Sequence, residues 1–188
     1  MRPLAVLLGL ALILCGCVSY DVDERGDPVK REGLAKDLVF DAKGRFMAIA
    51  TRLSPPHTII VNGKKPTERE IRLLGVEGKL ESEAPNTYRR SQEWMAEYLS
   101  HGETLYIKPQ RGADHNEYVI YGEVYLDAVD ENGKPIDGYV MVNMAMLSLG
   151  LVKLRDAREF QTPEMQKAMQ DVEDKARREK LGLWSDKP

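Results

Sequence analysis

Hydrophobic and polar residues alternate in several short runs along the middle of the chain. These runs lie at residues 45–52, 57–62, 69–76, 104–109, 117–127 and 138–143. Alternation with a period of two places successive side chains on opposite faces of a strand, as in a sheet with one buried face. The dipeptides Asn62-Gly63 and Asn132-Gly133 favour tight turns between antiparallel strands. The pattern therefore predicts a small antiparallel barrel or sheet.

Two segments next to these runs have a helical period instead. The first helix is predicted within residues 86–102, where one face recurs at helical spacing before a glycine stop. That face comprises Tyr88, Gln92, Met95 and Leu99, and the stop is Gly102. The second helix is predicted to start after Asn143, as its N-cap, and to end at Gly150.

The clearest helical signal begins at Thr162, whose side chain can cap the N–H groups of a first helical turn. Pro163 and Glu164 follow at positions that the first turn favours. The apolar stripe of this helix contains Met165, Met169, Val172 and Ala176. Strands followed by helices, with one helix between strands, indicate an α+β domain.

The first residues predict export and a lipid anchor. The apolar run from Leu4 to Leu14 is too short to cross a bilayer stably, which is typical of a signal peptide. It leads into "LCGC" at 14–17, which resembles the lipobox of bacterial lipoproteins. That resemblance implies cleavage after residue 16 and lipid attachment at Cys17. The alternative is an ordinary secretory signal with incidental cysteines.

We therefore expect a lipoprotein signal peptide at 1–16, a flexible polar tether at 17–37 and one folded domain at 38–188. The tether is expected because its sequence is charged and lacks a convincing apolar period. The lipid on Cys17 would hold the domain on the periplasmic or extracellular face of a membrane. Because no aspartate follows that cysteine directly, the outer membrane is favoured if the cell has one.

Composition excludes some classes of site from the folded domain. Both cysteines, Cys15 and Cys17, lie at the end of the leader, so the domain has neither a disulfide nor a thiolate metal site. The formal net charge of −3 becomes −4 when cleavage removes Arg2. A mildly acidic body gives no general attraction to nucleic acid or to anionic lipid.

Three segments suggest a family when they are taken together. They are "IRLLGVEG" at 71–78, "VNMAMLSLGLVKL" at 142–154 and "VEDKARREKLGLWSD" at 172–186. In this order and spacing they resemble the staphylococcal nuclease (thermonuclease) family, and Ala176, Gly182 and Trp184 make the last segment the most specific. The resemblance runs from about Ala48 to Asp186. It implies a five-stranded OB-type β-barrel with three helices, in which the arginine-bearing strand lines the active-site groove.

The resemblance also implies the chemistry to look for. In that family a calcium ion held by aspartates polarises a phosphodiester, a glutamate activates water and two arginines clamp the phosphate. Arg72 matches the strand arginine of the clamp, and Glu77 stands at a metal-ligand position. Glu81 is the candidate base, one residue late in the loop; alternatively, it is an ordinary surface-loop residue. Ca²⁺ or another divalent metal is expected only if this site works as a nuclease.

Two other parts of the family's site are replaced. His57, in "SPPHT" at 54–58, stands where the family has a metal-binding aspartate, and imidazole suits zinc or manganese better than calcium. The segment "HNEYV" at 115–119 stands where the family has its second clamp arginine, and no arginine lies between Gly112 and Asp127. Losing one such electrostatic group commonly costs about 10² in rate. Loss of the nuclease activity is therefore favoured.

Two functions remain open from the sequence. The first is a lipid-anchored domain that no longer cuts and that binds an envelope protein or an oligomeric ligand in the OB groove. The second is an active metal-dependent phosphodiesterase or nuclease that degrades extracytoplasmic DNA or RNA, with Asp114 or His57 completing a rearranged site. Nucleic acid is the weaker ligand, because Tyr118, Tyr121 and Tyr125 are interspersed with carboxylates and fit strand packing better than base stacking.

Overall fold

The computed structural model of the protein describes residues 38–54, 56–62, 68–99, 102–110, 118–130, 132–155 and 162–185. The expected signal peptide at 1–16, the lipid-attachment residue Cys17 and the expected tether at 17–37 lie outside the described residues. So does Asp114. None of the helices within the described ranges is both long and apolar enough to cross a membrane.

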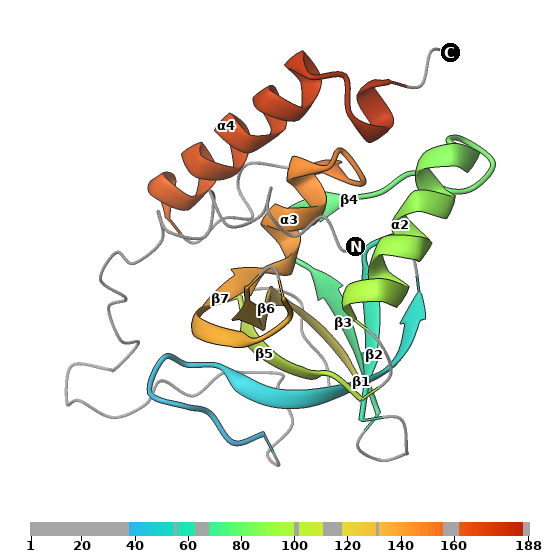
Figure 1. Cartoon of the computed structure of the whole chain (residues 1–188). Coiled ribbons are helices and arrows are strands. Elements are labelled where there is room, and N and C mark those ends of the chain that lie inside the picture. Colours follow the sequence, from blue (N-terminus) through green and yellow to red (C-terminus); the bar gives the residue numbers. More distant parts are fainter. Residues whose placement is uncertain are drawn as a thin grey trace.

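Five strands close into a barrel, drawn in the lower half of Figure 1. They are β1 (Phe46–Ser54), β2 (Thr58–Val61), β3 (Arg69–Leu73), β5 (Thr104–Pro109) and β6 (Val119–Val129). Their order is β3-β2-β1-β5-β6, and a β3–β6 pairing closes the ring. That closing pair is parallel, whereas the other four are antiparallel. The barrel is therefore mixed and not purely antiparallel as predicted, because the long connection through a helix and β5 brings β6 alongside β3 in the same direction.

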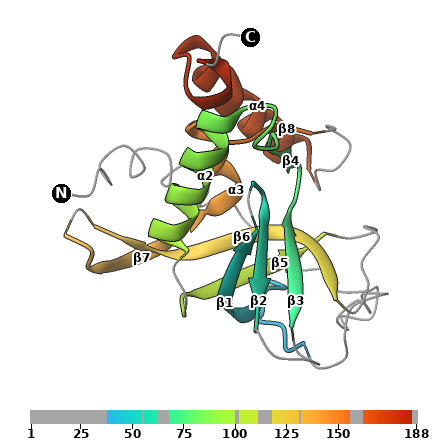
Figure 2. The same cartoon turned by 90° about the vertical axis from the view of Figure 1, so that its right-hand side faces the viewer.

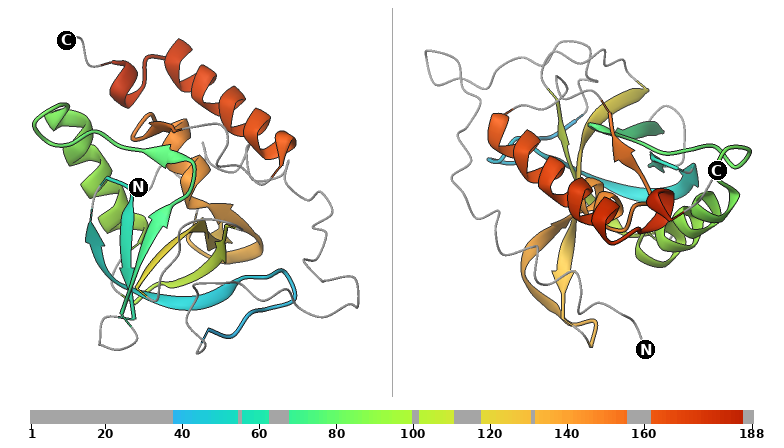
Figure 3. Two further views of the ribbon diagram at one scale, coloured as in Figure 1. Left: turned by 180° about the vertical axis from the view of Figure 1, so that it is seen from behind. Right: turned by 90° about the horizontal axis from the view of Figure 1, so that it is seen from above.

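The other elements extend and cover this barrel. Strand β7 (Pro135–Met141) pairs with β6 in a hairpin that projects beyond the barrel (Figure 2). Strands β4 (Val76–Glu77) and β8 (Lys153–Leu154) form a separate two-stranded sheet. The helices are α2 (Pro85–Tyr98), α3 (Val142–Ser148) and α4 (Pro163–Arg178), followed by a 3-10 turn at Gly182–Trp184. Figure 3 shows α4 lying across one end of the barrel, over α3.

Alternate residues of each strand fill the barrel. On β3, Ile71 and Leu73 are buried, whereas Glu70 and Arg72 on the opposite face are only partly buried. The same alternation buries Phe46, Ala48 and Ala50 on β1. The period of two read from the sequence is thereby confirmed, and it leaves the Arg72 side chain outside the apolar core.

Asn143 does not cap α3 as the sequence predicted. The N-cap is Met141, and Asn143 lies fully buried inside the first turn. Its Oδ1 accepts from the Val124 N–H at 3.0 Å, and its Nδ2 donates to the carbonyls of Leu74 at 3.0 Å and Gly122 at 3.3 Å. A side-chain amide both donates and accepts, so it satisfies backbone groups of both signs at a buried strand junction.

The predicted face of α2 is only partly right. Its buried residues are Thr87, Ser91 and Met95, whereas Gln92 is exposed. The Ser91 hydroxyl donates to the carbonyl of Pro56 at 3.4 Å. Two small polar residues therefore lie on the inner face, because α2 packs there against a loop backbone as well as against apolar side chains.

The cap and the stripe predicted for α4 are confirmed. The Thr162 hydroxyl accepts from the Met165 N–H at 3.2 Å, and Met169 and Ala176 are buried on the inner face. Glu173 lies on the same face and is also buried, which the sequence analysis did not anticipate. Its carboxylate has backbone and guanidinium partners, so it belongs to the packed interface.

Close backbone contact fixes the end of α4 against the turn after α3. A Cβ atom added to Gly182 would lie 2.1 Å from the Gly150 carbonyl oxygen, and both glycines have positive φ, 49° and 65° respectively. The Leu183 N–H donates to that same carbonyl at 2.8 Å. Nearby, Glu173 accepts from the Leu154 N–H at 2.8 Å. Only glycine at both positions allows this approach.

Candidate functional site

Arg72 lies on the outer face of β3, directly opposite Tyr121 on β6. Its Nε donates to Glu70 Oε1 at 2.6 Å and its Nη1 donates to the Tyr121 hydroxyl at 2.8 Å. The hydrogen bond to Glu70 is the main cause that raises the pKa of Arg72, and the bond to Tyr121 adds to it. The side chain remains 40% exposed. Arg72 is therefore a charged guanidinium in a fixed orientation that a ligand can still reach.

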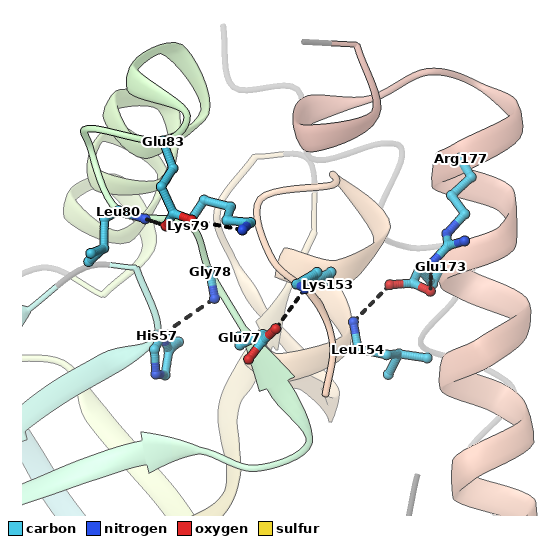
Figure 4. A network of polar contacts seen from close by, with 10 residues as sticks. All are labelled: His57, Glu77, Gly78, Lys79, Leu80, Glu83, Lys153, Leu154, Glu173 and Arg177. Atoms are coloured by element: carbon cyan, nitrogen blue, oxygen red, sulfur yellow. Dashed lines mark hydrogen bonds and ion pairs between the residues drawn. The ribbon is translucent and has the colours of Figure 1, made fainter. Parts of the chain in front are cut away.

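Glu77 lies on β4, opposite Lys153 on β8. Lys153 Nζ is 2.7 Å from Glu77 Oε1, as Figure 4 shows. This hydrogen bond is the main cause that lowers the pKa of Glu77, and the charges of Lys153, Arg155 and Lys79 lower it further. The carboxylate is thus ionised and held by an ammonium group at the position that the family resemblance gives to a metal ligand.

His57 immediately precedes β2 and faces the segment after β4. Its Nδ1 accepts from the Gly78 N–H at 3.4 Å (Figure 4). Burial is the main cause that lowers the pKa of His57, and the positive charges of Arg155 and Arg72 lower it further. The ring is therefore neutral, with Nδ1 directed at a backbone N–H and Nε2 carrying the proton.

The loops that carry His57 and Gly78 are in close contact. A Cβ atom added to Gly78 would lie 2.2 Å from Pro56 Cβ and 2.3 Å from Pro56 Cγ. Glycine at position 78 is therefore what allows the segment after β4 to lie directly against Pro56.

Glu81 lies in the turn that follows, and its side chain is exposed. Among the described residues it has no hydrogen-bond or ion-pair partner. The next carboxylate along the chain, Glu83, holds the turn instead: it accepts from the Leu80 N–H at 3.0 Å and pairs with Lys79 Nζ at 2.8 Å (Figure 4). No contact in this part of the structure directs Glu81 towards Arg72.

The oxygen and nitrogen donors here do not fit a divalent cation as they stand. Within the described ranges, no three His, Cys, Asp or Glu side chains gather as a set of metal ligands. Glu77 pairs with Lys153, and His57 accepts a backbone N–H, whereas calcium requires several oxygen ligands around one point. The catalytic roles assigned to Arg72 and Glu81 and the metal role assigned to Glu77 stay predictions.

Three neighbours of these residues were not predicted as part of the site. Glu70 could have been predicted from the sequence, because residues two apart on a strand share a face and Glu70 lies two residues before Arg72. Lys153 and Arg155 depend on the β4–β8 pairing, which the Arg155 N–H extends by donating to the Gly75 carbonyl at 2.9 Å. Strands as short as β4 and β8 leave no usable alternation in the sequence.

Comparison of the chain with known protein families gives one match. A family described as "Staphylococcal nuclease homologue" matches residues 70–186, which is more than half of the 188-residue chain. The matched range includes Arg72, Glu77 and Glu81, and it begins after His57. No curated protein matches the chain.

Proposed function

The chain belongs to the staphylococcal nuclease homologue family, and from this premise we propose that it is a lipid-anchored member that binds a ligand or partner in its groove without cleaving it. The observation that carries the proposal is the 2.7 Å contact between Glu77 and Lys153. The family's chemistry needs a metal ion at this position. Here Glu77 has the Lys153 ammonium group as its partner instead.

A lysine ammonium cannot replace the metal in catalysis. It carries one charge and three N–H donors, and it neither gathers several oxygen ligands nor acts as a Lewis acid on a phosphoryl oxygen. Glu81 lies in solvent without a contact that would position it as a base. The metal ion and the positioned base, both of which the family's mechanism requires, therefore have no support from these contacts.

The contacts of Arg72 favour ligand binding. Arg72 is charged, is oriented by Glu70 and Tyr121, and remains partly exposed. The outer face of an OB-type barrel accepts oligonucleotides, oligosaccharides and proteins, so retained binding does not require retained chemistry. We propose that this face binds an envelope protein or another extracytoplasmic ligand while Cys17 holds the domain at the membrane.

The second candidate is an active metal-dependent nuclease with a rearranged site. Arg72 favours it, because the clamp residue is held in a defined orientation by two hydrogen bonds. In this alternative Glu77 would hold a metal ion in place of Lys153, the ion would polarise the phosphodiester, and Glu81 would be the base.

A cleavage assay separates the two candidates. The full chain in detergent is incubated with single-stranded DNA or RNA and with Ca²⁺, Mn²⁺ or Zn²⁺, beside the variants Arg72→Ala and Glu81→Gln. We expect no cleavage above the metal-free control. Metal-dependent cleavage that both variants lose would establish the nuclease and overturn the proposal. A contaminating nuclease is recognised because it acts equally in all three preparations.

A fractionation experiment tests the anchor. We expect the full chain to sediment with membranes and a Cys17→Ser variant to appear in the soluble fraction, because lipid on one cysteine supplies the proposed attachment. Equal membrane association of both proteins would contradict a lipid anchor at Cys17.

A further inference from the structure

We infer that the outer face of the first half of β1 lies against the lipid bilayer, through an apolar patch made of Val39, Met47 and Ile49, and that this contact orients the domain. The inference rests on the lipid anchor of the proposed function, because the domain must be held at a membrane surface. It assigns a partner to a face of the barrel that includes neither Arg72 on β3 nor Glu77 on β4.

Exposed apolar side chains gather where the chain enters the domain. Of the seven large apolar side chains that are exposed in the described ranges, four lie between residues 39 and 49. The exposed fraction is 84% for Val39, 68% for Met47 and 42% for Ile49. Single exposed apolar residues are common on soluble proteins, whereas a group of them marks a surface that contacts another apolar body.

The strand register puts the three side chains of the patch on one face. Phe40 pairs antiparallel with Phe46, and one residue further along this register Val39 stands across from Met47. Met47 and Ile49 are two residues apart on β1 and share its outer face, whereas Phe46 is buried in the barrel. The patch is therefore one continuous strip of aliphatic side chains.

Two tyrosines and one arginine hold the edge of the patch in place. Tyr106 on β5 pairs with Met47, and its ring lies 5.0 Å from the ring of Tyr139 on β7. The Arg45 guanidinium lies 5.1 Å and 4.3 Å from the centroids of these two rings, and its Nη2 is 2.8 Å from Asp41 Oδ2. A tyrosine has an apolar ring and a polar tip, which suits the boundary between lipid and water.

The covalent path to the proposed anchor identifies the bilayer as the partner. Twenty residues separate Cys17 from Leu38, so a segment that spans at most about 75 Å joins the lipid to the residue before Val39. A link of that length keeps the patch at a high effective concentration next to the bilayer.

The size of the patch and the charge of the chain agree with this choice. A stable dimer buries about 20–30 residues on each side, whereas a bilayer accepts a few apolar side chains without a complementary shape. The formal net charge of −3 gives no general attraction to anionic lipid, so we expect the contact to depend on apolar burial.

Contact at this face leaves the candidate site open to water. Figures 1 and 2 show the segment before β1, drawn in blue, far from α4. Strands β1 and β3 are not neighbours, because β2 separates them on one side and β5 and β6 separate them on the other. Arg72 on β3 therefore stays accessible to a water-soluble ligand while the patch lies on the membrane.

Fluorescence quenching by labelled lipids tests the inference on the full chain. Met47→Cys and the matched control Leu80→Cys each receive an environment-sensitive maleimide; Leu80 is 61% exposed but lies in the turn after β4. The wild type treated with the same reagent gives the background from Cys15 and Cys17. On phosphatidylcholine vesicles with doxyl-labelled acyl chains, we expect the label at position 47 to lose most of its fluorescence and the label at position 80 to lose none. An apolar group at the interface enters about 5–10 Å into the boundary between headgroups and acyl chains.

A second arm tests whether the apolar side chains cause the contact. With the label on Ile49→Cys, adding Met47→Gln should reduce the quenching, whereas adding Leu80→Gln should leave it unchanged. Equal effects of the two glutamine substitutions would contradict a role for the patch.

The outcomes separate this inference from the proposed function. Vesicle association without quenching at position 47, or with equal quenching at positions 47 and 80, would overturn the patch and leave the lipid anchor in place. Protection of the label at position 47 from aqueous iodide, without quenching by doxyl lipid, would show that protein covers the patch and would overturn the bilayer assignment. Quenching at position 47 that survives Cys17→Ser would overturn the anchor and keep the patch.

Two further results bear on the proposed function. A wild-type chain that does not associate with the vesicles would overturn both the anchor and the bilayer contact. Metal-dependent cleavage of nucleic acid would overturn the proposed function without changing the quenching pattern.

Discussion

The helix-covered end of the barrel and the segments around β4 use their polar residues in different ways. At the helical end, Asn143 and Glu173 are buried and bind backbone groups that strand pairing leaves without partners. On β4 and in the turn after it, Glu77 and Glu83 are partly or fully exposed and pair with lysine side chains. The first kind of contact satisfies buried backbone groups, whereas the second joins partly or fully exposed side chains.

This difference separates the residues that the fold requires from the residues that the family's chemistry would use. Loss of a buried side chain that satisfies backbone groups leaves those groups unpaired, so such a residue is hard to replace. A partly exposed carboxylate can change its partner from a metal ion to a lysine at little cost in stability. Fold and activity therefore depend on different residues and can change separately.

The largest effect is expected for Asn143→Ala. The substitution leaves a buried N–H and two buried carbonyl groups without their side-chain partner, so the free energy of unfolding should fall by roughly 3–5 kcal/mol. Urea denaturation measures the change. Asn132→Ala, at the exposed tip of the β6–β7 hairpin, is the control and should change it by less than about 0.5 kcal/mol. A loss below about 1 kcal/mol for Asn143→Ala would erase the distinction between the two regions.

A smaller effect is expected for Gly78→Ala, because the new methyl group would overlap Pro56. The unfolding free energy should fall by about 1–3 kcal/mol. In a double-mutant cycle with Pro56→Gly, the two changes should couple by about 1 kcal/mol or more, since the second relieves the overlap created by the first. Strictly additive effects would contradict the close contact between Pro56 and Gly78.

Lys153→Met should cost less than about 1 kcal/mol at neutral pH, because both partners of the Glu77–Lys153 pair are about one-third exposed. The pKa of Glu77 should rise towards its ordinary value of 4.5, since its main cause of lowering is removed. A lowered folded-state pKa contributes stability above the unfolded value and loses it as the pH falls.

The stability difference between Lys153→Met and the wild type should therefore shrink at acidic pH. Urea denaturation at neutral pH and below pH 4.5 measures this. Lys175→Met, which removes the exposed pair with Glu179 on α4, is the control. A loss of several kcal/mol for Lys153→Met would mean that the Glu77–Lys153 pair is required by the fold.

The smallest effect concerns the titration of His57. Its pKa should lie below 6.5, because burial and the charges of Arg155 and Arg72 outweigh the opposing carboxylates of Glu77 and Glu70. The unfolded state then binds more protons in this range, so the stability contributed by His57 falls as the pH drops below 6.5. NMR titration should show an upward shift of this pKa in Arg155→Ala. A wild-type value at or above 6.5 would contradict the charge environment described here.

The strands of the barrel and the last helix were predictable from the sequence because their signals are local, whereas the parallel β3–β6 pairing that closes the barrel was not. Alternation identified the strands, and Thr162, Pro163 and the stripe through Met169 identified α4. The role of Asn143 was not predictable, because it depends on which backbone groups of β6 and of the turn after β3 lack partners in the folded barrel.

The candidate site was predictable only as far as single residues allow. The resemblance located Arg72 and Glu77, and strand alternation put Arg72 on the outer face. It did not show that Lys153 would meet Glu77, because that contact requires pairing between two strands of two residues each. Packing of Pro56 against Gly78 was likewise invisible, since nothing local relates the two loops.

Divalent-metal binding by the full chain tests the central claim most directly. Calorimetric titrations with Ca²⁺ and Mn²⁺, beside thermal unfolding at the same concentrations, measure whether Glu77 accepts a metal ion in place of Lys153. We predict no saturable binding and an unchanged Tm. One-to-one binding that raises the Tm, and that Glu77→Gln abolishes, would contradict the account.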